Sequence, residues 1–276
     1  MSDTKRPRKN PNPTLGLNPH NLHKNGVAIG FLPGFGEPIS PNSPSQINGK
    51  LPAPMAIVSR AERLRYQIAK IIMLCIVRTS GALRLGCIKR LNGNPVWQIA
   101  LMPYQGLETV TQQVMNGEWY KWGMQPKLFL RKWKMISQAV KSRTSRTYML
   151  WAPNALTGGV NDVRGGYAPY WPGAQYVDIL GFERKNVLPD RTKALKVIKK
   201  FSDLYSTPNN LPVVLSETGA SYTVSLETGR PAPGGASEHD MKLRWLKQLL
   251  GDNLIKSVPN FKAFSWFEVK KNEDAS

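Results

Sequence analysis

Short apolar runs recur along this sequence, and most of them alternate with stretches of helical periodicity. The runs predict strands at residues 27–33, 54–59, 97–103, 148–154, 176–181, 211–217 and 261–267. Apolar positions three and four apart predict helices at residues 61–75, 126–140, 192–205 and 237–250. Fully apolar strands that alternate with amphipathic helices are typical of a parallel sheet covered by helices. The pattern therefore predicts an α/β fold.

Several predicted strands end in a chemically active side chain, namely Asn154, Glu217 and Trp266. A (β/α)₈ barrel gathers such residues at the C-terminal ends of its strands, and it needs about 250 residues. The chain has 276 residues, so a single barrel would use nearly all of it. We therefore predict one barrel domain at residues 26–270, a disordered basic tail at 1–25 and a short C-terminal tail at 271–276.

The formal net charge of +20 raises the alternative of a nucleic-acid-binding protein. Lys and Arg outnumber Asp and Glu in the first two thirds, while the last 76 residues carry eight basic and nine acidic side chains. The sequence contains no helix-turn-helix, zinc-finger or RNA-recognition signature. Nucleic-acid binding is therefore the least favoured of the functions considered.

Other residue types exclude several kinds of site. The histidines show no metal-ligand spacing, so we expect neither a metal nor another cofactor. Cys75 and Cys87 make no disulfide framework, and the sequence leaves open whether they pair. The longest apolar run, Ile71–Val77, is too short for a membrane span. Residues 1–13 lack the apolar segment of a signal peptide.

Glu217 directly follows the apolar residues of the buried strand predicted at residues 211–217. A carboxylate at such a position must be paired, desolvated or functional. An isolated Glu there is more often a helix cap or an arginine partner. The Asn and aromatic residues at neighbouring strand ends favour catalysis instead.

Two loops are rich in aromatic side chains that could form platforms for sugar rings. The first contains Trp119 and Trp122 close to Asn116. The second contains Tyr170 and Trp171. Either loop could line a cleft, or could pack its aromatic side chains onto the barrel.

Five motifs occur in order along the chain. They are Asn-Gly-x-Trp with a following Trp-Gly, Trp-Ala-Pro-Asn, Tyr-Trp-Pro-Gly-x-x-Tyr-Val-Asp-Ile-Leu-Gly, Ser-Glu-Thr-Gly-Ala and a final Trp-Phe. Together they resemble glycoside hydrolase family 26, the β-mannanase-like retaining glycosidases, and especially its fungal members. The resemblance covers residues 27–33 and 100–268 and is strongest from Met115 onward.

This resemblance implies a (β/α)₈ TIM barrel with catalytic Glu residues after strands four and seven. Glu217 matches the strand-seven nucleophile, which would form a covalent glycosyl-enzyme. The resemblance also implies a set of substrate-binding residues: Asn116, Trp119, Trp122, Trp151, Asn154, Tyr170, Trp171 and Trp266. It further implies an extracellular enzyme that acts on a polysaccharide, but the sequence shows no signal peptide and so leaves the location open. We also expect a monomer without a membrane partner.

The strand-four region departs from the family pattern. Val114 stands where the family has its acid/base Glu, and a valine cannot donate a proton to the leaving oxygen. Glu118 is a weak substitute, because it comes four residues later and a retaining pair needs carboxyl groups about 5–5.5 Å apart. The stretch between Met102 and Met115 is also too short for the remainder of a βα unit and strand four. The barrel should therefore be incomplete, through an error in the inferred gene structure or through genuine decay.

Two functions remain after these departures. The first is a glycosidase of β-1,4-linked, mannan-type glycans that acts by retaining double displacement and is impaired at Val114. The alternative is a catalytically inactive barrel that still binds carbohydrate. The sequence does not identify the natural glycan.

Overall fold

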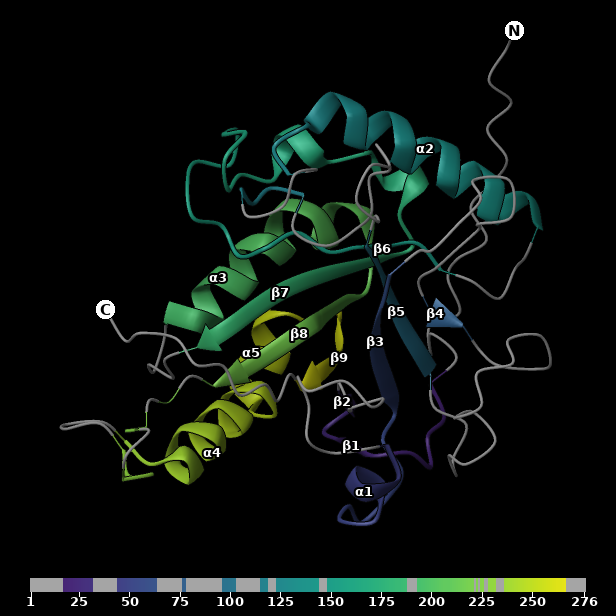
Figure 1. Cartoon of the computed structure of the whole chain (residues 1–276). Helices are drawn as coiled ribbons and strands as arrows, with labels where there is room; N and C mark the ends of the chain where they lie inside the picture. Colours follow the sequence, from purple (N-terminus) through teal and green to yellow (C-terminus); the bar gives the residue numbers. More distant parts are fainter. Residues whose placement is uncertain are drawn as a thin grey trace, which may run out of the picture.

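The protein is represented by a computed structural model that describes the chain in ranges separated by gaps. The described residues are 17–31, 44–63, 76–77, 96–102, 115–118, 123–143, 148–187, 193–220, 222, 224–225, 228–231 and 236–266. Within them the chain forms one sheet with helices packed against it (Figure 1).

Nine strands make up the sheet in the described residues. They are β1 (His23–Lys24), β2 (Val27–Phe31), β3 (Ile57–Arg63), β4 (Ile76–Val77), β5 (Val96–Met102), β6 (Leu150–Trp151), β7 (Ile179–Val187), β8 (Val213–Ala220) and β9 (Phe261–Trp266). Seven of them run parallel in the order β5-β3-β2-β9-β8-β7-β6. The two short strands β1 and β4 pair antiparallel with β2 and β5.

The first and the last parallel strands lie side by side, as they do in a closed barrel. Strand β2 pairs with β9 in continuous register from Ala28 opposite Ala263 to Phe31 opposite Trp266. Strands β5 and β6, by contrast, follow one another in the described chain but lie at opposite ends of the sheet. The described sheet is therefore open where a fourth parallel strand would stand. This arrangement is consistent with the predicted incomplete (β/α)₈ barrel.

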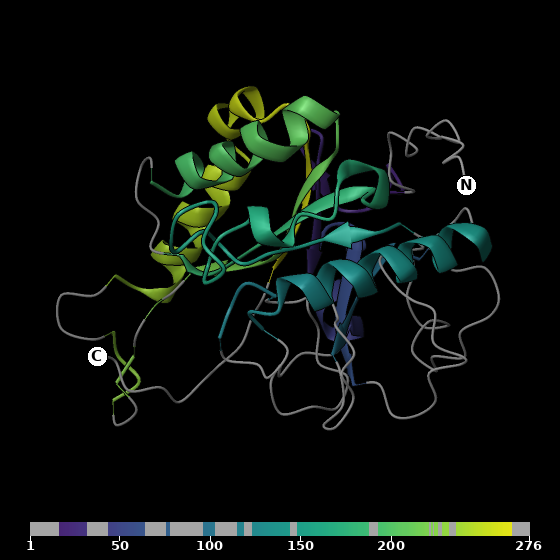
Figure 2. The same cartoon turned by 90° about the horizontal axis from the view of Figure 1, so that it is seen from above.

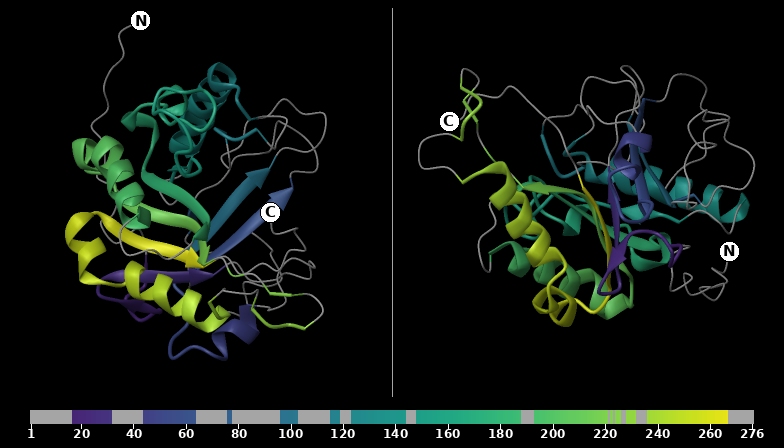
Figure 3. Two further views of the ribbon diagram at one scale, coloured as in Figure 1. Left: turned by 90° about the vertical axis from the view of Figure 1, so that its left-hand side faces the viewer. Right: turned by 90° about the horizontal axis from the view of Figure 1, so that it is seen from below.

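The helices lie in the connections between the parallel strands. They are α1 (Pro44–Asn48), α2 (Pro126–Arg143), α3 (Lys193–Phe201), α4 (Glu238–Leu249) and α5 (Asp252–Ser257), with short turns η2 (Ala168–Tyr170), η3 (Ala174–Tyr176), η4 (Ser202–Ser206) and η5 (Thr207–Asn209). Figures 2 and 3 show α3, α4 and α5 along the same side of the sheet. None of the helices in the described ranges has the length and apolar character required to cross a membrane.

The strongest sequence patterns are confirmed. The predicted helix at 126–140 is α2, which begins at Pro126, where a missing N–H costs nothing, and buries Phe129, Trp133 and Val140. Ser237, the first residue of the helix predicted at 237–250, accepts a hydrogen bond from the backbone N–H of Asp240 at 3.1 Å and caps α4. Strands were found at all seven predicted places, with shifted ends.

Some predicted boundaries are wrong. Residues 61–63 continue β3 and do not begin a helix, because Ala61–Arg63 pair with Ala100–Met102 of β5. The rest of that predicted helix, at 64–75, lies outside the described residues. Strand β6 contains only Leu150 and Trp151, and β7 begins later and ends later than predicted. The helix predicted at 192–205 changes at Ser202 from α-helix to a π-turn, η4.

The fold also begins before the predicted boundary at residue 26. Asn21 is buried, and its side-chain amide donates to the carbonyl of Met55 at 3.3 Å. The side chain of Asn25 donates to the carbonyl of Leu250 at 2.8 Å, which joins the N-terminal segment to the end of α4. Residues 17–25 therefore belong to the folded domain.

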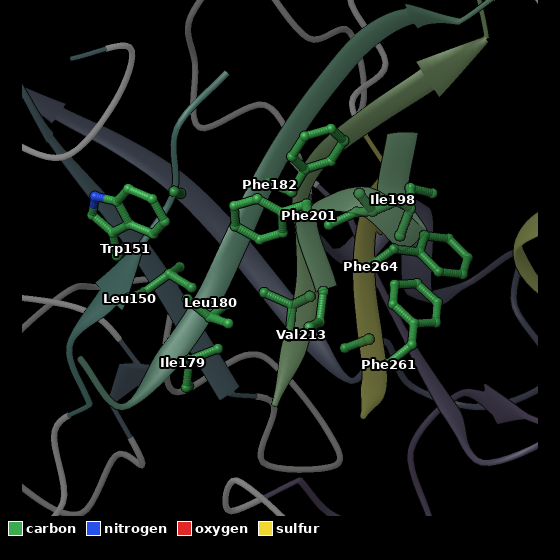
Figure 4. Packing of buried hydrophobic residues seen from close by; sticks show 14 of the residues in the cluster. Leu150, Trp151, Ile179, Leu180, Phe182, Ile198, Phe201, Val213, Phe261 and Phe264 are labelled. Atoms are coloured by element: carbon green, nitrogen blue, oxygen red, sulfur yellow. The ribbon is translucent and has the colours of Figure 1, made fainter. Parts of the chain in front are cut away.

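The core between the sheet and α3 is largely aromatic (Figure 4). Phe201 of α3 packs against Trp151 of β6 and Phe182 of β7, with ring centroids 5.9 and 5.2 Å apart. Side chains on this face of the sheet therefore point toward the helices. Residues next to them along each strand point to the opposite, inner face.

Candidate active site

Glu217 lies near the C-terminal end of β8 and is 4% exposed. The next residue, Thr218, faces the helices, because its hydroxyl oxygen accepts a hydrogen bond from the indole N–H of Trp245 on α4 at 2.9 Å. Since side chains alternate along a strand, Glu217 points to the inner face. The structure therefore places this carboxylate on the side where a barrel forms its cleft.

The register of β8 changes just before Glu217. Leu215 is opposite Phe182 of β7, but Glu217 is opposite Glu183, so β8 contains one additional residue at Ser216. A similar shift separates Leu215 from Thr218 in the pairing with β9. Irregularities of this kind re-aim side chains and are common next to active sites. Here the shift falls directly before Glu217.

The predicted acid/base position cannot be assessed structurally, because Val114 lies outside the described residues. Glu118 is described and has a different partner. Its carboxylate accepts a hydrogen bond from the guanidinium of Arg164, and the side chains of Glu118 and Arg164 are 47% and 71% exposed. Glu118 is thus part of a surface ion pair.

The fold brings Asn116 and Asn154 together, but their side chains have different partners. Asn116 is buried, and its side chain accepts from the backbone N–H of Asn154 at 3.0 Å and donates to the backbone carbonyl of Asn154 at 3.3 Å. The side-chain nitrogen Nδ2 of Asn154 is buried and has no hydrogen-bond partner among the described residues. Asn116 therefore connects two loops, whereas Asn154 has an unused donor.

A cavity of about 570 Å³ lies where these two loops meet. Its lining includes Asn116, Glu118, Asn154, Thr157, Asp162, Arg164 and Gly165. Gly165 has a positive φ of +76°, and a Cβ atom at this position would lie 2.0 Å from the hydroxyl oxygen of Thr157. Its N–H donates to the carbonyl of Asn116 at 2.7 Å. Only glycine fits this junction between the loops.

The aromatic residues after β6 pack mainly against each other. Trp151 and Tyr170 are fully buried, and Trp171 lies 4.8 Å from both Trp151 and Tyr205 between ring centroids. Burial raises the pKa of Tyr170 and of Tyr205 to about 12. Of the two roles considered for the second aromatic loop, this arrangement favours packing. Trp151 and Tyr170 expose no ring face to a ligand here.

Of the remaining predicted tryptophans, two lie outside the described residues and the third lies on the strand next to that of Glu217. Trp119 and Trp122 lie outside the described residues. Trp266 is the register partner of Thr218, so the alternation of β9 puts it on the helix-covered face and Ser265 on the face of Glu217. The assignments of these three tryptophans to the substrate cleft stay predictions.

Sequence reasoning missed the polar residues of the loop after β6. Thr157, Asp162 and Arg164 line the cavity, and Asp162 accepts from the backbone N–H of Gly159 at 2.5 Å. The closely spaced glycines at 158, 159, 165 and 166 were a usable signal, since they indicate a tight loop. Among the described residues, no three His, Cys, Asp or Glu side chains gather as a metal site would require.

Residues 111–214 match the model of Glycosyl hydrolase family 26. No curated protein is similar enough to count as a match. The chain resembles a Bacillus subtilis mannanase named BCman with 17% identity and a TM-score of 0.51, over 93% of this chain and 83% of that one. At this identity the likeness concerns the fold alone.

Two further solved structures show weaker likeness. An endo-β-1,4-mannanase double mutant of Cellulomonas fimi is 18% identical with a TM-score of 0.41, over 67% of this chain and 37% of that one. The catalytic domain of a family 26 endo-β-1,4-mannanase of Bacillus sp. JAMB-750 is 16% identical with a TM-score of 0.47, over 88% and 77%. The chain thus spans little more than a third of the length of the Cellulomonas fimi protein. The match over residues 111–214 confirms the resemblance to the glycoside hydrolases of family 26 that the motifs predicted.

Proposed function

We propose that this protein cleaves β-1,4-linked, mannan-type glycans by retaining double displacement, with Glu217 as the nucleophile and with activity impaired at position 114. The observation that carries the proposal is the position of Glu217, buried on the inner face at the C-terminal end of β8. Catalytic residues of (β/α)₈ barrels occupy the C-terminal ends of strands. The family match over residues 111–214 supports the reaction class.

In the proposed reaction, the Glu217 carboxylate attacks the anomeric carbon while the glycosidic oxygen leaves. A covalent glycosyl-enzyme forms, and water then releases the sugar with retained configuration. Both steps normally use a second carboxyl group as acid and then as base. Val114 supplies none, and loss of such a group typically lowers the rate by about 10²–10⁴.

The nucleophile is tested with 2-deoxy-2-fluoro-β-mannosyl fluoride. The fluoride leaves without acid assistance, and the 2-fluoro group slows hydrolysis of the glycosyl-enzyme. We expect mass spectrometry to find the added sugar on the peptide that contains Glu217, and no addition in Glu217→Gln. Labelling of another residue, or of none, in the folded protein would contradict the proposal.

The second test concerns the missing acid/base. We expect turnover of a 2,4-dinitrophenyl β-mannobioside, whose leaving group needs little protonation, and little or no turnover of mannan. Azide should accelerate the first reaction, because it attacks the glycosyl-enzyme without a general base. The variant Val114→Glu should increase mannan hydrolysis by about 10²–10⁴ if a carboxyl group at this position restores the missing function.

The alternative proposal is a barrel that binds carbohydrate without cleaving it, and Val114 is the feature that favours it. It predicts binding of oligosaccharides but no turnover of the aryl glycoside and no covalent label. The two assays together therefore distinguish an impaired enzyme from a binding protein.

A further inference from the structure

The turn between β1 and β2 is built from an exposed Asn-Gly pair. Asn25 and Gly26 connect the two strands, with Lys24 paired opposite Val27. Their φ angles are positive, at 52° and 77°, which is typical of a two-residue hairpin turn and is adopted most easily by Asn and Gly. The side chain of Asn25 donates to the carbonyl of Leu250 at the end of α4, at 2.8 Å. This hydrogen bond joins the hairpin to the helix.

An Asn-Gly pair is also the place where an asparagine most readily loses its amide group. The backbone nitrogen of the glycine attacks Cγ of the asparagine and forms a bond to it, because a glycine without Cβ hinders the approach least. The bond from Cγ to Nδ2 breaks, the backbone nitrogen gives its proton to the leaving nitrogen, and ammonia is released. Water then opens the succinimide ring, which yields Asp if the new bond to Cγ breaks and iso-Asp if the bond to the backbone carbonyl breaks.

The chain contains several Asn-Gly pairs, and the structure allows their restraints to be compared. They lie at residues 25–26, 48–49, 92–93 and 116–117, and the pair at 92–93 is outside the described residues.

The pair at Asn25 is only weakly restrained. No described atom lies within 4 Å of the position where a Cβ of residue 26 would stand, so the backbone nitrogen of Gly26 is not crowded from that side. Strand β1 consists of His23 and Lys24, both exposed, and a short exposed hairpin opens locally at little cost in free energy. The hydrogen bond from Asn25 to Leu250 is itself exposed and opens with the hairpin.

The two other described pairs are held more firmly. The side chain of Asn116 is buried, and both of its polar atoms bind the backbone of Asn154. Asn48 is half-buried as the last residue of α1, and its side chain accepts from the backbone N–H of Met55 at 3.0 Å. In both cases the carbon that must be attacked is fixed by a contact with a distant segment. Asn25 is therefore the most reactive of the three.

We propose that Asn25 is a deamidation site and that its conversion releases the N-terminal hairpin from the end of α4. The product carboxylate has no hydrogen to donate, and it places a second acceptor against the carbonyl oxygen of Leu250. Iso-Asp also inserts an additional carbon into the backbone, which disturbs the pairing of Lys24 with Val27. This chemistry does not depend on the proposed glycosidase activity.

The site is tested by a time course of the folded protein in warm, mildly alkaline buffer. Peptide mapping by mass spectrometry follows the mass that is gained when an amide becomes an acid. We expect Asn25 to convert first, and Asn116 to convert more slowly by a factor of about ten or more, because two hydrogen bonds must break first. In guanidinium chloride Asn25, Asn48 and Asn116 should convert at similar rates. Faster conversion of Asn48 or Asn116 in the folded protein, or an unreactive Asn25, would overturn the site.

The consequence is tested with Asn25→Asp, which makes the Asp product directly. Urea unfolding should show an unfolding equilibrium constant about two- to tenfold larger than in the unmodified protein, which corresponds to one lost hydrogen bond. As a matched control, Gln138→Glu makes the same change from amide to carboxylate on an exposed position of α2 and should alter the constant by less than about twofold. Equal constants for Asn25→Asp and the unmodified protein would overturn the proposed release.

Discussion

At the scale of single residues, the direction of Glu217 depends on its neighbour. Thr218 is held toward α4 by the indole N–H of Trp245, and both side chains are fully buried. Trp245→Phe removes this donor while keeping most of the ring packing. We expect the free energy of unfolding to fall by about 1–3 kcal/mol, the cost of losing a buried hydrogen-bond partner. Covalent labelling of Glu217 by the fluorosugar should also become slower, because the carboxylate is less well positioned.

A second tryptophan provides the matched control for this prediction. The indole N–H of Trp133 on α2 donates to the carbonyl of Tyr176 at 2.9 Å, so Trp133→Phe loses a comparable hydrogen bond. Urea unfolding should show a comparable loss of stability in both variants. Only in Trp245→Phe should the fluorosugar label Glu217 more slowly than in the unmodified protein. Equal labelling rates in both variants would argue against a positioning role for Trp245.

The buried tyrosines predict how stability changes in alkaline solution. Burial raises the pKa of Tyr205 in the folded state to about 12, from an ordinary value of 10.0. The unfolded chain therefore loses this proton first as the pH rises, which favours unfolding. Stability should be unaffected below pH 10 and should fall between pH 10 and 12. In urea titrations at several pH values, Tyr205→Phe should reduce this fall in the free energy of unfolding. An equally steep fall in the variant would show that Tyr205 does not cause it.

Asn116 and Asn154 show where sequence reasoning reached its limit at the site. The motifs placed Asn154 at a strand end and Asn116 in an aromatic loop, and the fold brings them together. Which of the two amides is available to a ligand depends on hydrogen bonds between loops that are distant in the sequence. Burial of Trp151 and Tyr170 depends in the same way on the packing of α3 and α2. A motif identifies the residue type, but the contacts decide its role.

At the scale of secondary-structure elements, α4 offers a direct test of a predicted boundary. Ser237 accepts from Asp240 N–H at 3.1 Å and donates to the Asp240 carboxylate at 2.8 Å. Ser237→Ala should lower the free energy of unfolding by about 1 kcal/mol. Ser142→Ala, on an exposed part of α2, should change it by less than about 0.5 kcal/mol. Equal effects in urea titrations would show that the cap contributes nothing.

The fold was largely predictable because its strands are short apolar runs between clear helical patterns. Strands β2, β5, β8 and β9 lie within a few residues of their predicted positions. The error at residues 61–63 has a physical cause, since pairing of β3 with β5 outweighs the helical spacing of apolar side chains. The additional residue at Ser216 could not be predicted, because it becomes visible only in the register between neighbouring strands.

At the scale of the whole molecule, the positive charge of α2 and α3 and the carboxylate of Glu217 lie on different faces of the sheet. Helix α2 contains six basic and no acidic residues, and its exposed basic side chains include Lys127, Arg131 and Lys134. Helix α3 has exposed lysines at 193, 196, 199 and 200. These helices cover the outside of the sheet, whereas Glu217 points to the inner face. The basic side chains of α2 and α3 therefore face solvent and not a ligand at Glu217.

The open sheet raises the question of whether two copies pair through their edges. An unpaired strand edge can serve as a template for another chain. One edge of the described parallel strands ends in β5, on which the short antiparallel strand β4 lies, and the other ends in β6, which has two residues. The β6 edge offers little backbone for edge-to-edge pairing, β4 covers part of the β5 edge, and the net charge of +20 opposes association. We therefore expect a monomer in light scattering after size exclusion, at low and at moderate salt. A stable dimer would contradict this prediction and would indicate that a second chain covers one of these edges.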